Sequence, residues 1–315
     1  MKKTLVIGST VVDVIITLED YLPKTQGDVH VLNQEMSLGG CAYNASDMIR
    51  HFNVPYILFS PVGTGAYGDF VRTNLAKRNI STPIPTPDEE NGCCYCFIEK
   101  TGERTFISYH GAEYRFQPEW FDLLDAEEID SVYICGFEIE EHTGIHVVEW
   151  LERHPQFTVY FAPGPRLNKI KPERMDRIFA LHPIIHLNEE EVCTYQKFAD
   201  SPASKSEGVM LENGAAYLSS LTGNTVIVTL GSKGAYYHSA EKCDYIAGIP
   251  ARQIDTIGAG DSHIGAVIAC RQIGMSLPDA IITANKVAAK VVETKGALLP
   301  DEEFAKLNLG SNFQF

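Results

Sequence analysis

Short apolar runs alternate along the chain with stretches in which apolar residues recur every three or four positions. The runs are rich in β-branched and aromatic residues, which is typical of buried strands. They predict strands at Leu5–Gly8, Tyr56–Val62, Ser131–Cys135, Thr158–Phe161, Pro183–Leu187 and Thr225–Leu230. The intervening periodic stretches predict helices at Ala66–Arg78, Gly144–Arg153, Lys171–Leu181, Glu189–Phe198 and Glu207–Thr222. This alternation predicts an α/β fold in which helices cover both faces of a mostly parallel sheet.

Two segments break the alternation. Val11–Leu18 with Val29–Met36, and Cys93–Glu99 with Thr105–Tyr109, predict antiparallel pairs joined by charged or Gly-containing turns. A small sheet of this kind has one face uncovered unless it closes over a cleft or meets a partner. Ser81–Glu90, with three prolines, reads as a surface loop. We therefore expect one domain over residues 1–315, with the small sheet contributed by residues 11–37 and 92–110.

Composition and charge narrow the possible functions. The chain has 315 residues, and 26 basic against 41 acidic residues give a net charge of −15, which argues against nucleic-acid and anionic-membrane partners. No apolar run approaches the roughly 20 residues that a membrane span needs. Met1-Lys2-Lys3 leads directly into a strand-like run instead of a signal peptide, so we expect a cytoplasmic protein.

Three of the eight cysteines, Cys93, Cys94 and Cys96, lie close together in the sequence. Alternate residues of a strand point to opposite faces, and no His lies nearby, so a metal site is disfavoured. We interpret these cysteines as small apolar residues of a strand.

One loop carries the strongest chemical signal in the chain. It reads Asp255-Thr256-Ile257-Gly258-Ala259-Gly260-Asp261 and precedes a stretch in which Ile264, Val267 and Ile268 repeat at helical spacing. Backbone N–H groups at a helix start lack partners within the helix, and the helix dipole adds partial positive charge, so such a position binds phosphate. With a carboxylate in the first turn, the loop suggests phosphoryl transfer to a hydroxyl group. The proposed anion hole comprises Thr256, Gly258, Ala259 and Gly260, and Asp261 accepts the proton.

Alone, Gly-Ala-Gly before a helix is more often a tight turn. A second glycine pair, Gly39-Gly40, favours a functional role for the loop over a simple turn, because this pair follows an extended segment and opens another helix. The buried face of that helix is expected at Ala42, Ala45, Met48, Ile49 and Phe52. Asn44 lies beside this face, where it can hydrogen-bond a hydroxyl. The two helices can therefore face one cleft, with phosphate on one side and its acceptor on the other.

These motifs resemble the two signatures of the ribokinase-type (PfkB) carbohydrate kinases. The later run matches in its glycines, Ala259 and the aspartate, and the earlier Gly39-Gly40-Cys41-Ala42-Tyr43-Asn44-Ala45 matches more loosely. Asn188-Glu189-Glu190-Glu191 matches the family's Asn-x-x-Glu element. The resemblance spans the chain from Gly8-Ser9 to Lys295-Gly296-Ala297. It implies a three-layer α/β/α ribokinase-like fold, with the small sheet as a lid through which a homodimer forms.

The resemblance also implies an acceptor site for a small-molecule sugar. Asp13 with Gly39, Gly40 and Asn44 would hold the acceptor hydroxyls, and Glu138 matches a carboxylate that touches the sugar. Judged by itself, Asp13 is equally well a turn or edge-strand carboxylate.

For ATP, Thr229-Leu230-Gly231-Ser232-Lys233-Gly234 resembles the family's loop beside the phosphates and ribose, although a hairpin turn into Ala235 is the alternative. Asn285 matches a position that lies against adenine. The expected ATP-binding residues are Asn188, Thr229, Gly231, Ser232, Gly234, Thr256 and Asn285.

Two ions follow from the same resemblance. Asn188 and Glu191 would organise Mg²⁺ and its waters, because Mg²⁺ prefers oxygen ligands and retains water. Backbone carbonyls around Asp255, Ile257 and Gly296 would hold a monovalent cation such as K⁺, as in some relatives.

Three departures from the family bear on the acceptor. Cys41 stands where ribokinases have Lys, and His263 stands where the family usually has Phe, so we expect a packing histidine. After the strand that ends at Phe161, Ala162-Pro163-Gly164-Pro165-Arg166 carries Ala where many relatives have Asp. Arg166 either pairs with an acidic or phosphorylated substrate or caps a surface loop.

The sequence thus predicts an ATP-dependent kinase that phosphorylates a primary hydroxyl of a small sugar or sugar acid. One rival is a nucleoside kinase of the same fold, favoured if Tyr43, Tyr95 and Phe97 stack on a base. The other rival is a non-catalytic sugar-sensing protein, which the intact anion loop and Asp261 disfavour.

Overall fold

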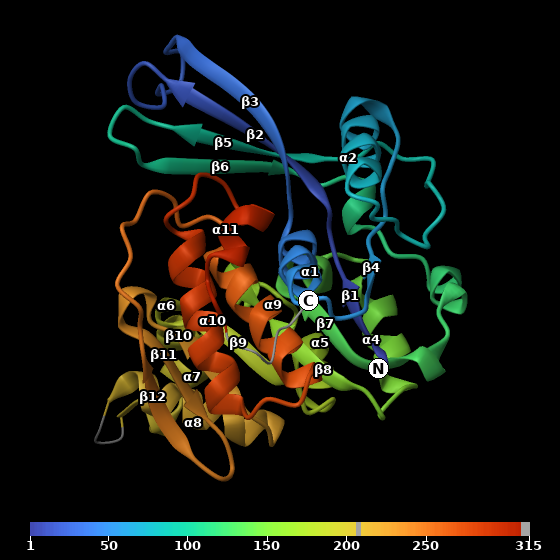
Figure 1. Cartoon of the computed structure of the whole chain (residues 1–315), viewed down its shortest axis with the longest axis vertical. Coiled ribbons are helices and arrows are strands. Elements are labelled where there is room, and N and C mark those ends of the chain that lie inside the picture. The colour runs from blue at the N-terminus through green and yellow to red at the C-terminus, as the bar shows by residue number, and fades with distance from the viewer. Residues whose placement is uncertain (206–208, 310–315) are drawn as a thin grey trace.

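The computed structural model describes residues 1–205 and 209–309 and builds them around two sheets (Figure 1). The larger sheet has the strand order β12-β11-β10-β9-β8-β7-β1-β4. Its parallel strands are β1 (Lys3–Ile7), β4 (Tyr56–Phe59), β7 (Ile129–Cys135), β8 (Thr158–Ala162), β9 (Ile184–Asn188) and β10 (Val226–Thr229). β11 (Gly234–His238) and β12 (Cys243–Ala247) add an antiparallel edge. The predicted, mostly parallel sheet is confirmed.

Alternate residues of the large sheet enter two separate hydrophobic cores, because successive side chains of a strand point to opposite faces. Val6 of β1 packs in the core under α1 (Cys41–His51), α9 (Ala259–Gln272) and α10 (Leu277–Val291). Its neighbours Leu5 and Ile7 pack in the core under α4 (Gly144–Glu152), α5 (Pro172–Phe179) and α8 (Met210–Thr222). The result is the expected arrangement of three layers.

The remaining helices are short or lie at the margins of these layers. They are α2 (Gly65–Lys77), α3 (Gly136–Glu140), α6 (Glu189–Thr194), α7 (Gln196–Ala199) and α11 (Asp301–Ala305). Among the described residues, no helix has the length and apolarity that crossing a membrane requires.

The small sheet has the order β3-β2-β5-β6 and extends beyond α9, α10 and α11 at the top of Figure 1. Its strands are β2 (Val11–Leu18), β3 (Val31–Gly39), β5 (Cys93–Ile98) and β6 (Arg104–Tyr109). Both predicted antiparallel pairs form, and parallel pairing of β2 with β5 joins them into one sheet.

The two faces of the small sheet carry different residues, and one face is turned toward α9. Asp13 and Cys94 lie opposite each other on what we call the inner face. Arg104 shares this face and reaches Asp255, so the inner face is turned toward the start of α9. The outer face carries the alternate residues, which include Val14, Met36, Tyr95 and Ile107.

One predicted helix is wrong in its extent. The pattern Glu189–Phe198 is interrupted at Tyr195, whose backbone is extended at φ −61° and ψ 115°. The side chain of Asn168 accepts from Gln196 N and donates to Thr194 O, so it takes over the backbone groups at the break. The predicted helix at 207–222 begins at Met210, and its first two positions lie outside the described residues.

Candidate active site

The two glycine-opened helices, α1 and α9, meet at their first turns. Gly40 and Gly258 precede them with positive φ values of 101° and 73°, which glycine adopts without strain. Asn44 Nδ2 of α1 donates to Asp261 Oδ2 of α9 over 2.9 Å. The two motifs therefore lie on the same side of the molecule, in contact.

The residues predicted to bind the acceptor gather around this contact. A Cβ atom on Gly39 would collide with the carboxylate of Asp13, so a side chain there would displace that carboxylate. Glu138 accepts from the N–H of Ser9 over 2.6 Å and from the thiol of Cys135 over 2.5 Å. Gly8, next to Ser9, lies directly against the Glu138 carboxylate. Glu138 therefore anchors the turn that leads to Asp13.

Carboxylates crowd this site, and their pKa values rise. Burial, followed by the negative charge of Asp261, raises the pKa of Asp13 to about 7. Burial raises the pKa of Asp261 to about 6, against hydrogen bonds from Asn44 and Cys41 that lower it, while the charge of Glu138 adds to the rise. Burial also raises the pKa of Glu138, although hydrogen bonds from Cys135 and Ser9 oppose it. No Lys or Arg within residues 1–205 and 209–309 forms an ion pair with these three carboxylates.

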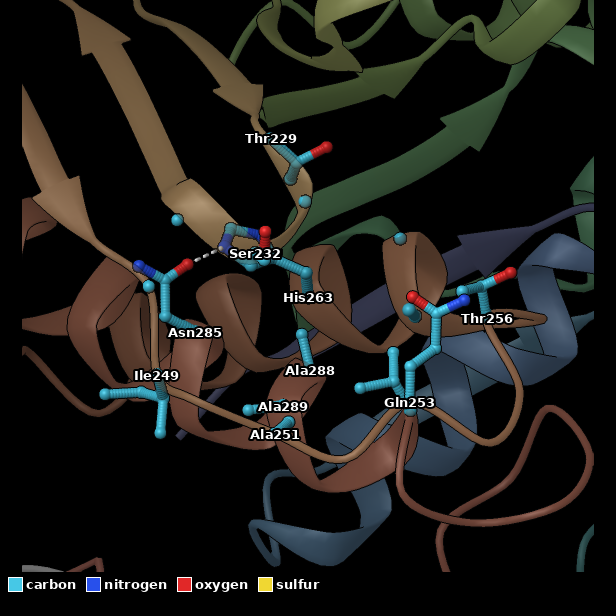
Figure 2. A pocket seen from close by; sticks show the side chains of 16 residues that line it. Thr229, Ser232, Ile249, Ala251, Gln253, Thr256, His263, Asn285, Ala288 and Ala289 are labelled. Atoms are coloured by element: carbon cyan, nitrogen blue, oxygen red, sulfur yellow. Dashed lines mark hydrogen bonds between the residues drawn. The ribbon is translucent and has the colours of Figure 1, made fainter.

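A pocket beside the start of α9 brings together most of the residues predicted to bind ATP (Figure 2). Asn285 and Ile249 lie at one end of it and Thr256 at the other. The loop from Thr229 to Gly234 is both a wall of this pocket and the turn of the β10–β11 hairpin. The predicted residues that line the pocket are Thr229, Gly231, Ser232, Gly234, Thr256, Ala259, Gly260 and Asn285.

Several lining residues were not singled out from the sequence, among them Gln253, Ile249 and Ala251. Others follow a pattern that the sequence contains. Ala288, Ala289 and Val292 continue from Asn285 at three- and four-residue spacing and form one face of α10 and its end. Ala288 and Ala289 were the sequence signal for this wall of the pocket, because small side chains leave room for a ligand.

His263 belongs to a buried chain of hydrogen bonds behind the pocket. Asn285 Nδ2 donates to the carbonyls of Ile246 and Ala247, so its Oδ1 is the acceptor for His263 Nε2 at 3.1 Å. His263 Nδ1 then accepts from His186 Nε2 at 3.0 Å. Burial lowers the pKa of His263 to about 4 and that of His186 well below its usual value. Both rings are neutral at physiological pH, and Asn285 is held as part of the pocket wall.

The residues predicted for Mg²⁺ form a helix cap at the carboxyl end of β9. Asn188 Oδ1 accepts from Glu191 N over 2.8 Å, and Glu191 Oε2 accepts from Asn188 N over 2.9 Å. Burial and the charges of Glu190 and Asp261 raise the pKa of Glu191, although the Asn188 N–H lowers it. Because Glu191 lies near enough to feel Asp261 and presents oxygen donors, this pair fits a water-mediated Mg²⁺ site.

The residues predicted for a monovalent cation fit such an ion less well than Asn188 and Glu191 fit Mg²⁺. Asp255 Oδ1 accepts from Arg104 Nη1 over 2.5 Å and from Ile257 N over 2.9 Å. Asp255 Oδ2 accepts from Gly296 N over 3.0 Å. The positive charge that a cation would bring to this carboxylate is therefore already supplied by Arg104.

The aromatic residues whose stacking would favour a nucleoside acceptor lie away from the Asn44–Asp261 contact. Tyr43 is fully buried in the core beneath α1. Tyr95 and Phe97 lie on the outer face of the small sheet, opposite the inner-face residues Cys94 and Cys96. The reason is the alternation of side chains along β5, which turns both rings away from Asp261.

Arg166 is engaged within the protein. Its Nε lies 3.2 Å from Glu140 Oε2, and its guanidinium lies 4.6 Å from the ring centre of Phe137. This favours the interpretation of Arg166 as a residue that stabilises its own loop.

Comparison with known proteins finds matches over nearly the whole chain. A family profile described as pfkB family carbohydrate kinase matches residues 1–303. An uncharacterized sugar kinase of Escherichia coli (strain K12) is 31% identical over 296 residues, which are 94% of this chain and 90% of the relative.

Solved structures share the fold. A ribokinase of Thermotoga maritima superposes with a TM-score of 0.82 at 22% identity, covering 98% of this chain and 99% of its own. A ribokinase of Arabidopsis thaliana complexed with ribose and ATP gives 0.79 at 19%, covering 100% and 99%. Solved nucleoside kinases have this fold as well. At these identities the likeness shows the fold alone.

Proposed function

The chain belongs to the pfkB family of carbohydrate kinases, and we propose that it transfers the γ-phosphoryl group of ATP to a primary hydroxyl of a small neutral sugar. One observation carries the proposal. The Asn44–Asp261 hydrogen bond sets a carboxylate between the acceptor residues of α1 and the N–H groups at the start of α9.

In the proposed reaction, Asp13, Gly39, Gly40 and Asn44 hold the acceptor hydroxyls. Asp261 removes the proton from the attacking hydroxyl as its oxygen forms a bond to the γ-phosphorus and the bond to the ADP oxygen breaks. With a pKa of about 6, Asp261 is mostly ionised at neutral pH and still basic enough to take the proton late. N–H groups at Gly258, Ala259 and Gly260 stabilise the charge on the transferred group.

The nucleotide would lie in the pocket of Figure 2, with its base toward Asn285 and Ile249 and its phosphates toward Thr256. Asn188 and Glu191 would hold Mg²⁺ through water, and the ion, when bound, neutralises phosphate charge. The His263–Asn285 chain keeps the wall of this pocket in place.

The charge of the acceptor site favours a neutral sugar over a sugar acid. A substrate carboxylate would lie beside Asp261, which is mostly ionised at neutral pH, and like charges repel in a partly buried site. Arg166, which the sequence offered as a partner for an acidic substrate, is paired with Glu140.

The small sheet would act as the lid of a single kinase domain and as the contact of a homodimer. Its outer face exposes Met36, Ile107 and Tyr109 at 46%, 51% and 57%. Ile107 and Tyr109 lie on β6 beside Tyr95 and form an apolar patch of the kind that marks association surfaces, while Met36 lies on the opposite edge strand, β3.

A substrate panel tests the proposed activity. Neutral sugars, sugar acids and nucleosides are supplied with Mg-ATP, and ADP release is followed by a coupled assay. We expect turnover to be highest with a neutral sugar. A preference for a sugar acid or a nucleoside would contradict the acceptor class, and sugar binding without ADP release across the panel would favour a sensing protein.

Asp261→Asn tests the mechanism within the same panel. The variant should bind ATP nearly as the wild type does, measured by calorimetry, while turnover falls by about 10²–10⁴-fold or more, because the base is lost. Near-normal turnover would refute the role of Asp261.

A further inference from the structure

Two ion pairs connect the inner face of the small sheet to the loop before α9 and the loop after α10. Arg104 of β6 pairs with Asp255, and Glu35 of β3 pairs with Lys295. The two pairs differ in burial. The side chains of Arg104 and Asp255 are 23% and 5% exposed, whereas those of Lys295 and Glu35 are 67% and 41% exposed. The first pair is therefore shielded from water and salt, and the second is a surface pair that contributes little.

Asp255 lies at the base of the loop that supplies the anion hole. Its carboxylate accepts from the N–H of Ile257, one residue before Gly258, and from the N–H of Gly296 in a separate loop. Gly258 in turn packs so closely against Ala297 that a Cβ atom would collide with that residue. One carboxylate thus fastens two loops together where they form the entry to α9.

The charge on Asp255 needs compensation because the group is almost fully buried. Two backbone N–H groups provide part of it, and Arg104 provides a full positive charge from the small sheet. Burial alone would raise the pKa of Asp255, but hydrogen bonds from Arg104, Ile257 and Gly296 outweigh it and lower the pKa. An unpaired carboxylate at this depth would favour rearrangement of the loop.

We propose that Arg104 is a positioning residue for phosphoryl transfer, which completes the Asp255 clamp when the small sheet closes and so fixes the N–H groups of the anion hole. The inference rests on the proposed kinase activity. It makes the alignment of the anion hole depend on closure of the small sheet. It also assigns to Arg104 the positive charge at Asp255 that a monovalent cation would otherwise supply.

The test compares Arg104→Gln with Glu35→Gln, which removes the exposed pair from the same sheet. With the best sugar from the panel, kcat of Arg104→Gln should fall by about 10–100-fold, since misplaced catalytic groups cost about this much. Its affinity for ADP, which lacks the γ-phosphate, should stay within about twofold of the wild type by calorimetry. Glu35→Gln should keep kcat within about twofold. Equal kcat for both variants and the wild type would overturn the proposal.

Two further measurements separate positioning from a general loss of structure. Millimolar guanidinium, at constant ionic strength, should restore part of the lost kcat in Arg104→Gln and should not accelerate the wild type. Arg104→Lys should retain more kcat than Arg104→Gln, because it keeps the charge but not the planar fork. If neither added guanidinium nor the lysine substitution restores any of the lost kcat, the proposal is overturned, even if Arg104→Gln is slow.

The wild-type protein provides a test that needs no variant. When KCl replaces choline chloride at equal ionic strength, the Tm of the wild type should not change. Its kcat should stay within about twofold. A clear rise in Tm and kcat with K⁺ would show that a cation, and not Arg104, serves Asp255. These outcomes are distinct from failure of the proposed function, which would appear as absence of ADP release by the wild type with every acceptor.

Discussion

Asn44 and Asp261 are 217 positions apart in the sequence, and a hydrogen bond of 2.9 Å from the amide of Asn44 to the carboxylate of Asp261 joins the helices that carry them. The bond stabilises the ionised form of Asp261 and fixes the direction of one carboxylate oxygen. In the proposed reaction it joins the acceptor side of the cleft to the phosphate side, and it leads directly to the first prediction.

Replacing Asn44 by Ala should change the pH dependence of turnover as well as its size. The hydrogen bond from Asn44 lowers the pKa of Asp261, so its removal should raise that pKa and shift the acidic limb of kcat/KM to higher pH. The loss should therefore be greater near pH 6 than near pH 8. Profiles of kcat/KM against pH for both proteins provide the check. A parallel loss at all pH values would mean that Asn44 acts only in acceptor binding.

The buried carboxylates of the site should lower the free energy of unfolding at neutral and alkaline pH. The pKa of Asp13 is raised from 3.8 to about 7, so the folded protein holds this proton where the unfolded chain has lost it. The free energy of unfolding should accordingly fall as the pH rises from about 4 to about 7.

Asp13→Asn should remove this cost. At pH 8 we expect a gain of about 1–3 kcal/mol in the free energy of unfolding, or several °C in Tm, with no gain near pH 4. Turnover should fall in the same variant, because a hydroxyl ligand is lost. The exposed change Asp122→Asn is the matched control and should leave Tm unchanged at both pH values. A variant of Asp13 that is less stable than the wild type at pH 8 would refute the argument.

His263→Phe should destabilise the protein and alter its response to acid. The change leaves Asn285 Oδ1 and His186 Nε2 without their present partner, at a cost of about 1–3 kcal/mol. Because the pKa of His263 is lowered from 6.5 to about 4, the unfolded chain binds more protons between these values, and wild-type stability should fall as the pH falls through this window.

Thermal unfolding at several pH values tests both effects. The Tm of His263→Phe should vary less between about pH 6.5 and pH 4 than the wild-type Tm, and the KM for ATP should rise as the pocket wall loosens. An unchanged slope of Tm against pH would show that His263 does not carry this dependence.

The outer face of the small sheet should determine the oligomeric state. Ile107→Glu places a charge in the exposed apolar patch and should convert a dimer into a monomer, measured by light scattering after gel filtration. Leu123→Glu alters an equally exposed apolar side chain away from the small sheet and serves as the control. If the wild type is monomeric, or Ile107→Glu stays dimeric, association does not use this face.

Much of the architecture was readable from local patterns. The strands of the parallel sheet and the two helices opened by Gly39-Gly40 and Asp255–Asp261 lie where apolar periodicity and glycine placed them. The loop from Thr229 to Gly234 also lies at a pocket with Asn285. These features depend on periodicity and backbone conformation, which neighbouring residues determine.

Other features depended on residues that are distant in the sequence. The helical pattern at Glu189–Phe198 breaks because Asn168 takes the backbone groups at Tyr195. Tyr95 and Phe97 point away from the cleft because pairing of β5 with β2 decides which face turns inward. The arginine that neutralises Asp255 could not be foreseen from either segment.

The sequence by itself therefore determined the kind of fold and the two glycine-opened helix starts, and it singled out Asp261 as the proposed base. Tertiary structure alone decided which polar groups face one another, as in Asn44 with Asp261, His186 with His263 and Arg104 with Asp255. The physical reason is that hydrophobic periodicity acts within a single helix or strand, whereas the partner of a buried polar side chain is chosen by the packing of elements far apart in the chain.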